Sequence, residues 1–162
     1  MPLIKDGAFV EDAWTYADEE GPLPEGPVIV SLTRWQNEKE ALAARTAPLG
    51  IKLLSGEEPK EIAGDLDKFA LIALDFPMFK NGRAYSYARL LRERYGYKGE
   101  LRATGDVLRD QLFFMHRCGF DAYEVSQRIT IDGWKEAMEE ISVVYQPASD
   151  GRKTIFQARH GG

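Results

Sequence analysis

The sequence predicts an α/β fold with about five mostly parallel strands that alternate with helices, preceded by an N-terminal β-hairpin. Three observations predict this class. From Pro27 onward, short apolar runs alternate with segments of helical periodicity, which is the order of repeated βα units. The run "ALIALDF" (70–76) is apolar on both faces, as in a central parallel strand. An Asp-Gly pair near the N-terminus separates two short apolar runs, which is typical of a type I′ hairpin turn.

The expected elements follow in order along the chain. The hairpin pairs "LI" with "AFV" across "KDG", and the acidic, Pro- and Gly-rich "ADEEGPLPEGP" (17–27) is expected to be an exposed loop. Asp106 is expected to cap a helix that Gly119 ends. An Asp-Gly turn within 143–162 predicts another hairpin strand at the sheet edge. Strands are expected at 28–32, 50–55, 70–76, 99–104 and 120–125, and helices at 37–47, 57–69, 83–95, 106–118 and 132–142.

Two sheet arrangements fit this order. An open doubly wound sheet carries helices on both faces, whereas the alternative is a half TIM-barrel-like sheet. Both begin with repeated βα units, and both place ligand sites at the carboxyl ends of the strands.

Length and composition favour one cytoplasmic domain. The 162 residues are divided into a hairpin and acidic loop (1–26), a βα core (27–145) and a C-terminal extension (146–162). No apolar run approaches the roughly 20 residues of a membrane span, and the N-terminus resembles no targeting signal. A single cysteine excludes an internal disulfide and a CxxC pair, and no motif identifies a metal or a cofactor.

The charge is unevenly distributed. Residues 1–77 hold 7 Lys/Arg against 15 Asp/Glu, whereas residues 78–128 hold 10 against 6, within a total charge of −5. This asymmetry favours an anionic ligand or acidic partner at the middle segment and gives no indication of nucleic-acid binding; solvated helix faces are the alternative explanation.

Several polar residues stand near the carboxyl ends of the expected strands, where ligands bind in α/β sheets. The ligand hypothesis assigns an anion to Arg83, Ser86, Arg102 and Thr104, with Asp75, Asp106 and Glu124 holding the arginines and with Lys80 and Asn81 in a nearby loop. An ion pair of Arg102 with Asp75 or with Glu124 is the structural alternative, because buried charges must be paired.

The arginines of the segment 83–94 are expected to differ in role. Arg83 follows a glycine in the first turn of its helix, where a guanidinium and backbone N–H groups can hold sulfite, sulfate, phosphate or a carboxylate. Arg92 and Arg94 are expected on exposed faces.

His116 and the lone Cys118 are expected in the last turn of their helix, away from the carboxyl edge of the sheet. A helix C-terminus stabilises a cationic histidine and disfavours a thiolate. We therefore expect Cys118 to be a small buried residue of low reactivity.

The segment Leu71 to Val125, "LIALDFPMFKNGRAYSYARLLRERYGYKGELRATGDVLRDQLFFMHRCGFDAYEV", resembles a bacterial family of unknown function whose members are labelled oxidoreductases of sulfite reduction and are encoded with genes for assimilatory sulfate reduction. The resemblance implies an accessory or oxidoreductase-associated protein of that process. It leaves two hypotheses open: a protein that binds a small oxyanion or anionic cofactor, and a non-catalytic docking partner of sulfite reductase or a related enzyme. Ligand, catalysis and oligomeric state stay open.

Overall fold

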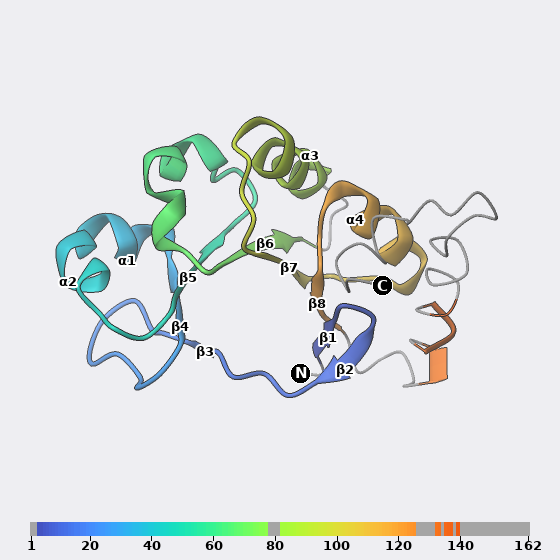
Figure 1. The fold of residues 1–162 in the computed structure, drawn as a ribbon, viewed down its shortest axis with the longest axis horizontal. Coiled ribbons are helices and arrows are strands. Elements are labelled where there is room, and N and C mark those ends of the chain that lie inside the picture. Colours follow the sequence, from blue (N-terminus) through green and yellow to red (C-terminus); the bar gives the residue numbers. More distant parts are fainter. Residues whose placement is uncertain (1–2, 78–81, 126–131, 134, 138, 140–162) are drawn as a thin grey trace.

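The computed structural model describes residues 3–77, 82–125, 132–133, 135–137 and 139. Its central feature is an eight-stranded sheet with the strand order β2-β1-β8-β7-β6-β5-β4-β3, curled into a half-barrel (Figure 1). The strands are β1 (Leu3–Lys5), β2 (Ala8–Val10), β3 (Thr15–Tyr16), β4 (Val28–Ser31), β5 (Leu49–Leu53), β6 (Leu71–Phe76), β7 (Glu100–Gly105) and β8 (Ala122–Glu124).

Strands β3 to β8 are parallel and stand in the order in which they occur in the sequence. The five strands predicted after the hairpin correspond to β4–β8, and β6 lies inside the sheet between β5 and β7, as predicted. The count rises to eight because the hairpin adds β1 and β2 to β8, antiparallel, and because the two-residue β3 pairs with β4. The turn residues Asp6 and Gly7 have φ values of 52° and 85°, which the type I′ turn requires.

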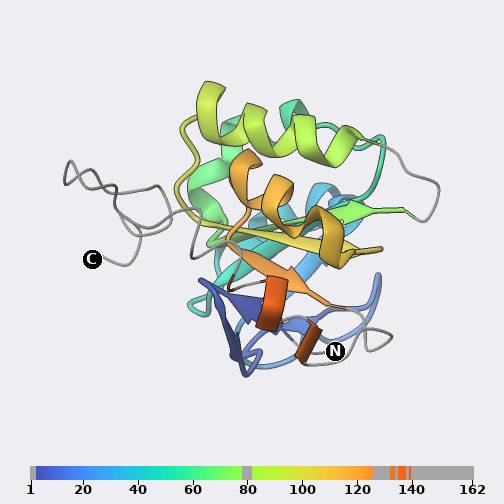
Figure 2. The ribbon, with the colours of Figure 1, turned by 90° about the vertical axis from the view of Figure 1, so that its right-hand side faces the viewer.

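The helices gather on one face of the sheet (Figure 2). They are α1 (Leu32–Asn37), α2 (Lys39–Ala43), the 3₁₀-helix η1 (Pro59–Lys68), α3 (Arg83–Arg89), the π-helical turn η2 (Leu90–Arg94), the 3₁₀-turn η3 (Arg109–Gln111) and α4 (Leu112–Cys118). A sequential strand order sends every right-handed crossover in the same direction, so that all crossovers land on the same face. The half-barrel alternative is therefore correct, and the expectation of helices on both faces is wrong.

The main core lies between this helical face and the sheet. Trp35 of α1 packs edge-on against Phe69, with ring centroids 4.9 Å apart, and Ala84 and Ala88 seat α3 on the sheet. The opposite, concave face is covered by the N-terminal segment instead. There Trp14 packs on a second apolar cluster that consists of Ile29, Leu71 and Ala73.

The helix that we expected to begin at Asp106 begins at Leu112 instead, after η3. The Asp106 N–H donates to the Phe76 carbonyl oxygen at 2.7 Å, which fastens it to the end of β6 rather than to a helix. Leu108 is then extended, with φ −105° and ψ 142°. Gly119 ends α4 at φ 114°, as predicted.

Other predictions concern the end of the chain. Residues 132–133, 135–137 and 139 are helical, in agreement with the helix expected there. The hairpin within 143–162 and the loop residues Lys80 and Asn81 lie outside the described residues. In the described part of the chain, no helix is both long and apolar enough to cross a membrane.

Candidate functional site

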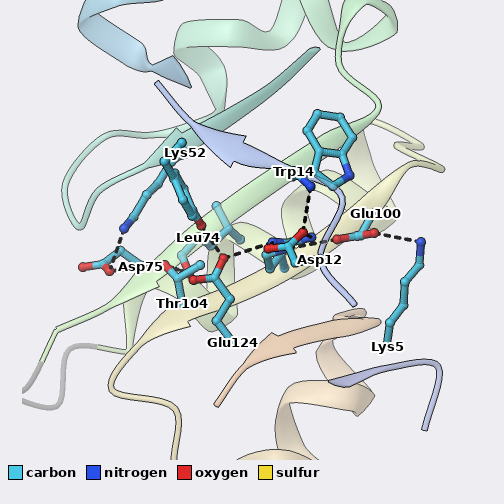
Figure 3. Close-up of polar contacts among 11 residues, drawn as sticks. Lys5, Asp12, Trp14, Lys52, Leu74, Asp75, Glu100, Thr104 and Glu124 are labelled. Atoms are coloured by element: carbon cyan, nitrogen blue, oxygen red, sulfur yellow. Dashed lines mark hydrogen bonds and ion pairs between the residues drawn. The ribbon is translucent and has the colours of Figure 1, made fainter. Parts of the chain in front are cut away.

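Polar side chains from four adjacent strands meet on the concave face, at the carboxyl ends of β5 to β8 (Figure 3). Alternate residues of a strand face opposite sides of a sheet. In β6, Leu71 and Ala73 belong to the concave cluster, so Asp75 faces the same way. The register places Lys52 opposite Ala73 and Thr104 opposite Asp75. Glu124 continues this row on β8.

The first group on this face is the Arg102 cluster, which consists of Arg102, Asp12, Glu100 and Glu124. The Arg102 side chain is 1% exposed, and its guanidinium contacts all three carboxylates. Nη1 and Nη2 donate to the two oxygens of Asp12 at 2.8 and 3.1 Å. Nε donates to Glu100 at 3.0 Å, and Nη1 also donates to Glu124 at 3.1 Å.

These contacts fix the charge of Arg102. Burial lowers its pKa, but the hydrogen bonds and charges of Asp12, Glu100 and Glu124 outweigh burial, so the pKa lies above its usual value. Glu100 also pairs with Lys5 at 2.9 Å. Four of the five guanidinium N–H positions are used. Arg102 therefore retains little capacity to bind a ligand.

The second group is the Lys52 cluster, which consists of Lys52, Asp75, Thr104 and Tyr16. Lys52 Nζ lies 3.8 Å from Asp75 Oδ1 and 5.3 Å from the centroid of the Tyr16 ring. The Thr104 hydroxyl lies 3.3 Å from the same Asp75 oxygen, and 3.5 Å from the Leu74 carbonyl oxygen.

Tyr16 connects the two groups, because its hydroxyl donates to Glu124 Oε2. Burial and the neighbouring Glu124 carboxylate raise the pKa of the Tyr16 hydroxyl above its usual range, since both disfavour the phenolate. Tyr16 is therefore a hydrogen-bond donor at neutral pH.

The structure brings together four of the predicted residues, Arg102, Thr104, Asp75 and Glu124. The ion pair of Arg102 with Glu124 is present, whereas Asp75 pairs with Lys52. Arg83 and Ser86 lie on α3, which packs on the opposite face of the sheet.

Asp106 and Arg83 lie on the helical side of the sheet, Asp106 at a small cavity and Arg83 beside the loop after β5. Asp106 lines a cavity of about 110 Å³ together with Phe76, Tyr85 and Gln111. A Cβ atom on Gly56, in the loop after β5, would lie 3.4 Å from the Arg83 guanidinium, so Arg83 is close to that loop. Burial raises the pKa of the Tyr85 hydroxyl to about 12.

Sequence reasoning missed four residues of these two clusters: Asp12, Tyr16, Lys52 and Glu100. A signal existed for Lys52, because it is the one charged residue in the otherwise apolar strand "GIKLL". A lone charge in a buried strand requires a partner or a function. Asp12 and Tyr16 lie in a segment without periodicity, and only the folded chain brings them to β7 and β8.

Arg92 differs from the expectation that it is exposed. Its guanidinium donates to three carbonyl oxygens, those of Gly119 at 3.0 Å and of Tyr97 and Gly99 at 2.8 Å each, and it lies 3.5 Å from Asp121. The prediction is wrong because it assumed regular α-helical periodicity, whereas Leu90–Arg94 form a π-helical turn and the Arg92 side chain lies against the loops that follow. Arg94 is exposed, as predicted.

His116 and Cys118 lie in the last turn of α4, as predicted, and both are buried, which confirms the burial expected of Cys118. The Arg89 guanidinium donates to the Cys118 sulfur at 3.4 Å. Among the described residues, no three His, Cys, Asp or Glu side chains are grouped so that they could hold a metal ion.

Comparison with known families gives one match. The family described as "Bacterial protein of unknown function (DUF934)" matches residues 50–156. The chain belongs to this family. The matched range contains Lys52, Asp75, Arg102, Thr104 and Glu124, whereas Asp12 and Tyr16 precede it. No curated protein and no solved structure matches the chain.

Proposed function

We propose that the protein serves assimilatory sulfite or sulfate reduction as an accessory or oxidoreductase-associated protein, and that it binds a small oxyanion or anionic cofactor on the concave face. The setting is supported by the resemblance of the segment 71–125 to a family with that label. Binding is supported by the Lys52 cluster at the carboxyl ends of parallel strands, the edge where α/β sheets hold their ligands.

The ammonium of Lys52 is the observation that carries the binding proposal. Its contact with Asp75, at 3.8 Å, is longer than a charge-assisted hydrogen bond of about 2.7–2.9 Å, and the side chain is 30% exposed. Among the described residues, no acceptor lies within hydrogen-bond distance of Nζ. None of the three N–H groups of Nζ therefore donates to the described part of the chain, and we assign them to the ligand.

Lys52 replaces Arg102 as the charged contact that we assign to the anion. Arg102 is buried and engaged by three carboxylates, so an anion that displaced one of them would leave that carboxylate unpaired. Thr104 and Tyr16 lie beside Lys52, but their hydroxyl groups donate to Asp75 and Glu124, so the charged contact with the anion is assigned to the ammonium alone. Asp75 orients the ammonium and neutralises its positive charge when no ligand is bound.

The test is a titration of the purified protein with sulfite, sulfate, phosphate, flavins and nicotinamides. Calorimetry measures the affinity, and thermal shift measures the change in melting temperature. We expect an anion to bind the wild type and to lose roughly tenfold or more in affinity in Lys52→Met, because a hydrogen bond to a charged group contributes about 1.5–3 kcal/mol. Lys68→Met is the matched control, since Lys68 is a similarly exposed lysine that pairs with Asp65. Equal losses in both variants would contradict the proposal.

One observation favours the docking alternative. Phe114 of α4 is 41% exposed, with the Arg89 guanidinium 5.7 Å from its ring centroid. An exposed aromatic ring beside an arginine is typical of a protein contact. Purified sulfite reductase should then bind the wild type and bind Phe114→Ser much more weakly, whereas Lys52→Met should bind it normally.

A further inference from the structure

The charges around Lys52 restrict the kind of anion that the concave face can accept. The ion pairs described above join three cations, Lys5, Lys52 and Arg102, to four carboxylates, Asp12, Asp75, Glu100 and Glu124. This group of side chains carries one negative charge in excess. A bare anion at Lys52 would therefore be attracted by the ammonium but repelled by the surrounding carboxylates, which weakens its binding.

Asp75 is the carboxylate that a ligand at Lys52 would affect most. It faces Lys52 at 3.8 Å and remains 22% exposed. Its described hydrogen bond comes from the Thr104 hydroxyl at 3.3 Å, a long contact to one oxygen. An anion on the Lys52 ammonium would weaken the ion pair and leave Asp75 with a neutral donor as its partner.

We propose that the ligand of the Lys52 cluster is a small zwitterion, with an acid group for Lys52 and an amino group for Asp75. This inference rests on the proposed function, because it names the class of anion that the same site binds. Such a ligand exchanges one ion pair for two and keeps the net charge of the face unchanged. It also satisfies the carboxylate that a bare oxyanion would leave exposed.

Taurine and isethionate are matched probes for this idea. Both carry a sulfonate on a two-carbon chain, and they differ in that taurine ends in an ammonium and isethionate in a hydroxyl. Because a charge-assisted hydrogen bond contributes about twice as much as a neutral one, taurine should bind the wild type roughly tenfold more tightly, as measured by calorimetry at low salt.

Two variants separate the roles of the charges. Asp75→Asn keeps the size of the side chain and an acceptor for Thr104, but removes the negative charge. It should lose the preference for taurine and bind isethionate or sulfite more tightly than the wild type does. Lys52→Met should lose both probes, and Lys68→Met should bind both as the wild type does. Circular dichroism and melting curves establish that each variant is folded.

The outcomes distinguish this inference from the proposed function. If isethionate or sulfite binds the wild type as tightly as taurine, the zwitterion inference is wrong while anion binding at Lys52 stands. If neither probe nor any inorganic oxyanion binds at millimolar concentration, or if Lys52→Met binds them normally, both proposals are wrong. If Asp75→Asn still prefers taurine, the inference is also wrong, because a group other than Asp75 would then bind the taurine ammonium.

Discussion

The two charged clusters of the concave face use the same kinds of residue in different ways. In the Arg102 cluster, one buried guanidinium donates four hydrogen bonds to three carboxylates. In the Lys52 cluster, one partly exposed ammonium faces one carboxylate beyond hydrogen-bond distance. The difference shows that the saturation of the donors, rather than the presence of a cation, separates a structural ion pair from a candidate binding site.

The two clusters also differ in what they hold together. Arg102 joins β7 and β8 to the N-terminal segment, because Asp12 lies 90 residues away in sequence. That segment then places Trp14 on the concave apolar cluster and Tyr16 beside Lys52. The Arg102 cluster is therefore the support on which the Lys52 cluster is built.

Replacing Arg102 should have the largest effect on stability. Arg102→Met should lower the free energy of unfolding by about 3–5 kcal/mol, because removing one partner of a buried ion pair leaves the others uncompensated. Here three carboxylates would lose their shared cation. Urea denaturation at neutral pH measures the change.

Arg94→Met is the control for this prediction, because Arg94 is an exposed arginine outside the Arg102 cluster. Its stability should stay within about 0.5 kcal/mol of the wild type. Similar stabilities for the two variants would show that the Arg102 cluster contributes little to the fold.

Asp12 should have the next largest effect. Asp12→Asn removes the charge from the bidentate contact with Arg102 and should cost about 1.5–3 kcal/mol, the range of hydrogen bonds to charged groups. Glu11→Gln changes the charge of the exposed neighbouring residue and should have almost no effect. Loosening of the N-terminal segment should appear as faster proteolysis near Trp14, and unchanged proteolysis would contradict the role of Asp12 as its anchor.

The sequence was informative wherever one local rule determined the outcome. The β6 run, the Asp6-Gly7 turn and the Gly119 helix end each follow from periodicity or from a backbone requirement, and each prediction is confirmed. The start of α4 was predicted wrongly, because the Phe76 carbonyl oxygen engages the Asp106 backbone. No local pattern records this contact between two strand ends.

The candidate site was harder to predict because it depends on contacts between distant segments. The position of Arg102 near a strand end was apparent, and its pairing with Glu124 followed from the cost of burying a charge. The contribution of Asp12 was not apparent, since it requires the segment before β4 to cross the concave face. Arg92 was assigned to the surface for a similar reason: its three carbonyl acceptors come from loops that helical periodicity does not place.

Tyr16 should have a smaller effect that depends on pH. Tyr16→Phe removes the hydrogen bond to Glu124 and should cost about 0.5–1.5 kcal/mol at pH 7. The pKa of Tyr16 is raised in the folded protein, so its contribution is complete below the usual tyrosine pKa of about 10 and declines as the pH rises above that value. Urea denaturation at pH 7 and pH 10.5 should therefore show a smaller difference between wild type and variant at the higher pH, and a constant difference would contradict the assignment.

Lys52 should have the smallest effect on stability, although it carries the proposed function. Lys52→Met removes a partly exposed ion pair with a long contact, and such pairs contribute about 0–1 kcal/mol, while the methionine retains the apolar stem that packs beside Tyr16. Denaturation of the ligand-free protein should thus separate Lys52→Met from Arg102→Met by several kcal/mol. A loss from Lys52→Met as large as that from Arg102→Met would mean that the ammonium is a structural group like the guanidinium, and the distinction between the two clusters would then fail. We expect Lys52→Met to have nearly wild-type stability and to lose anion binding. This combination identifies a lysine that binds a ligand and does not support the fold.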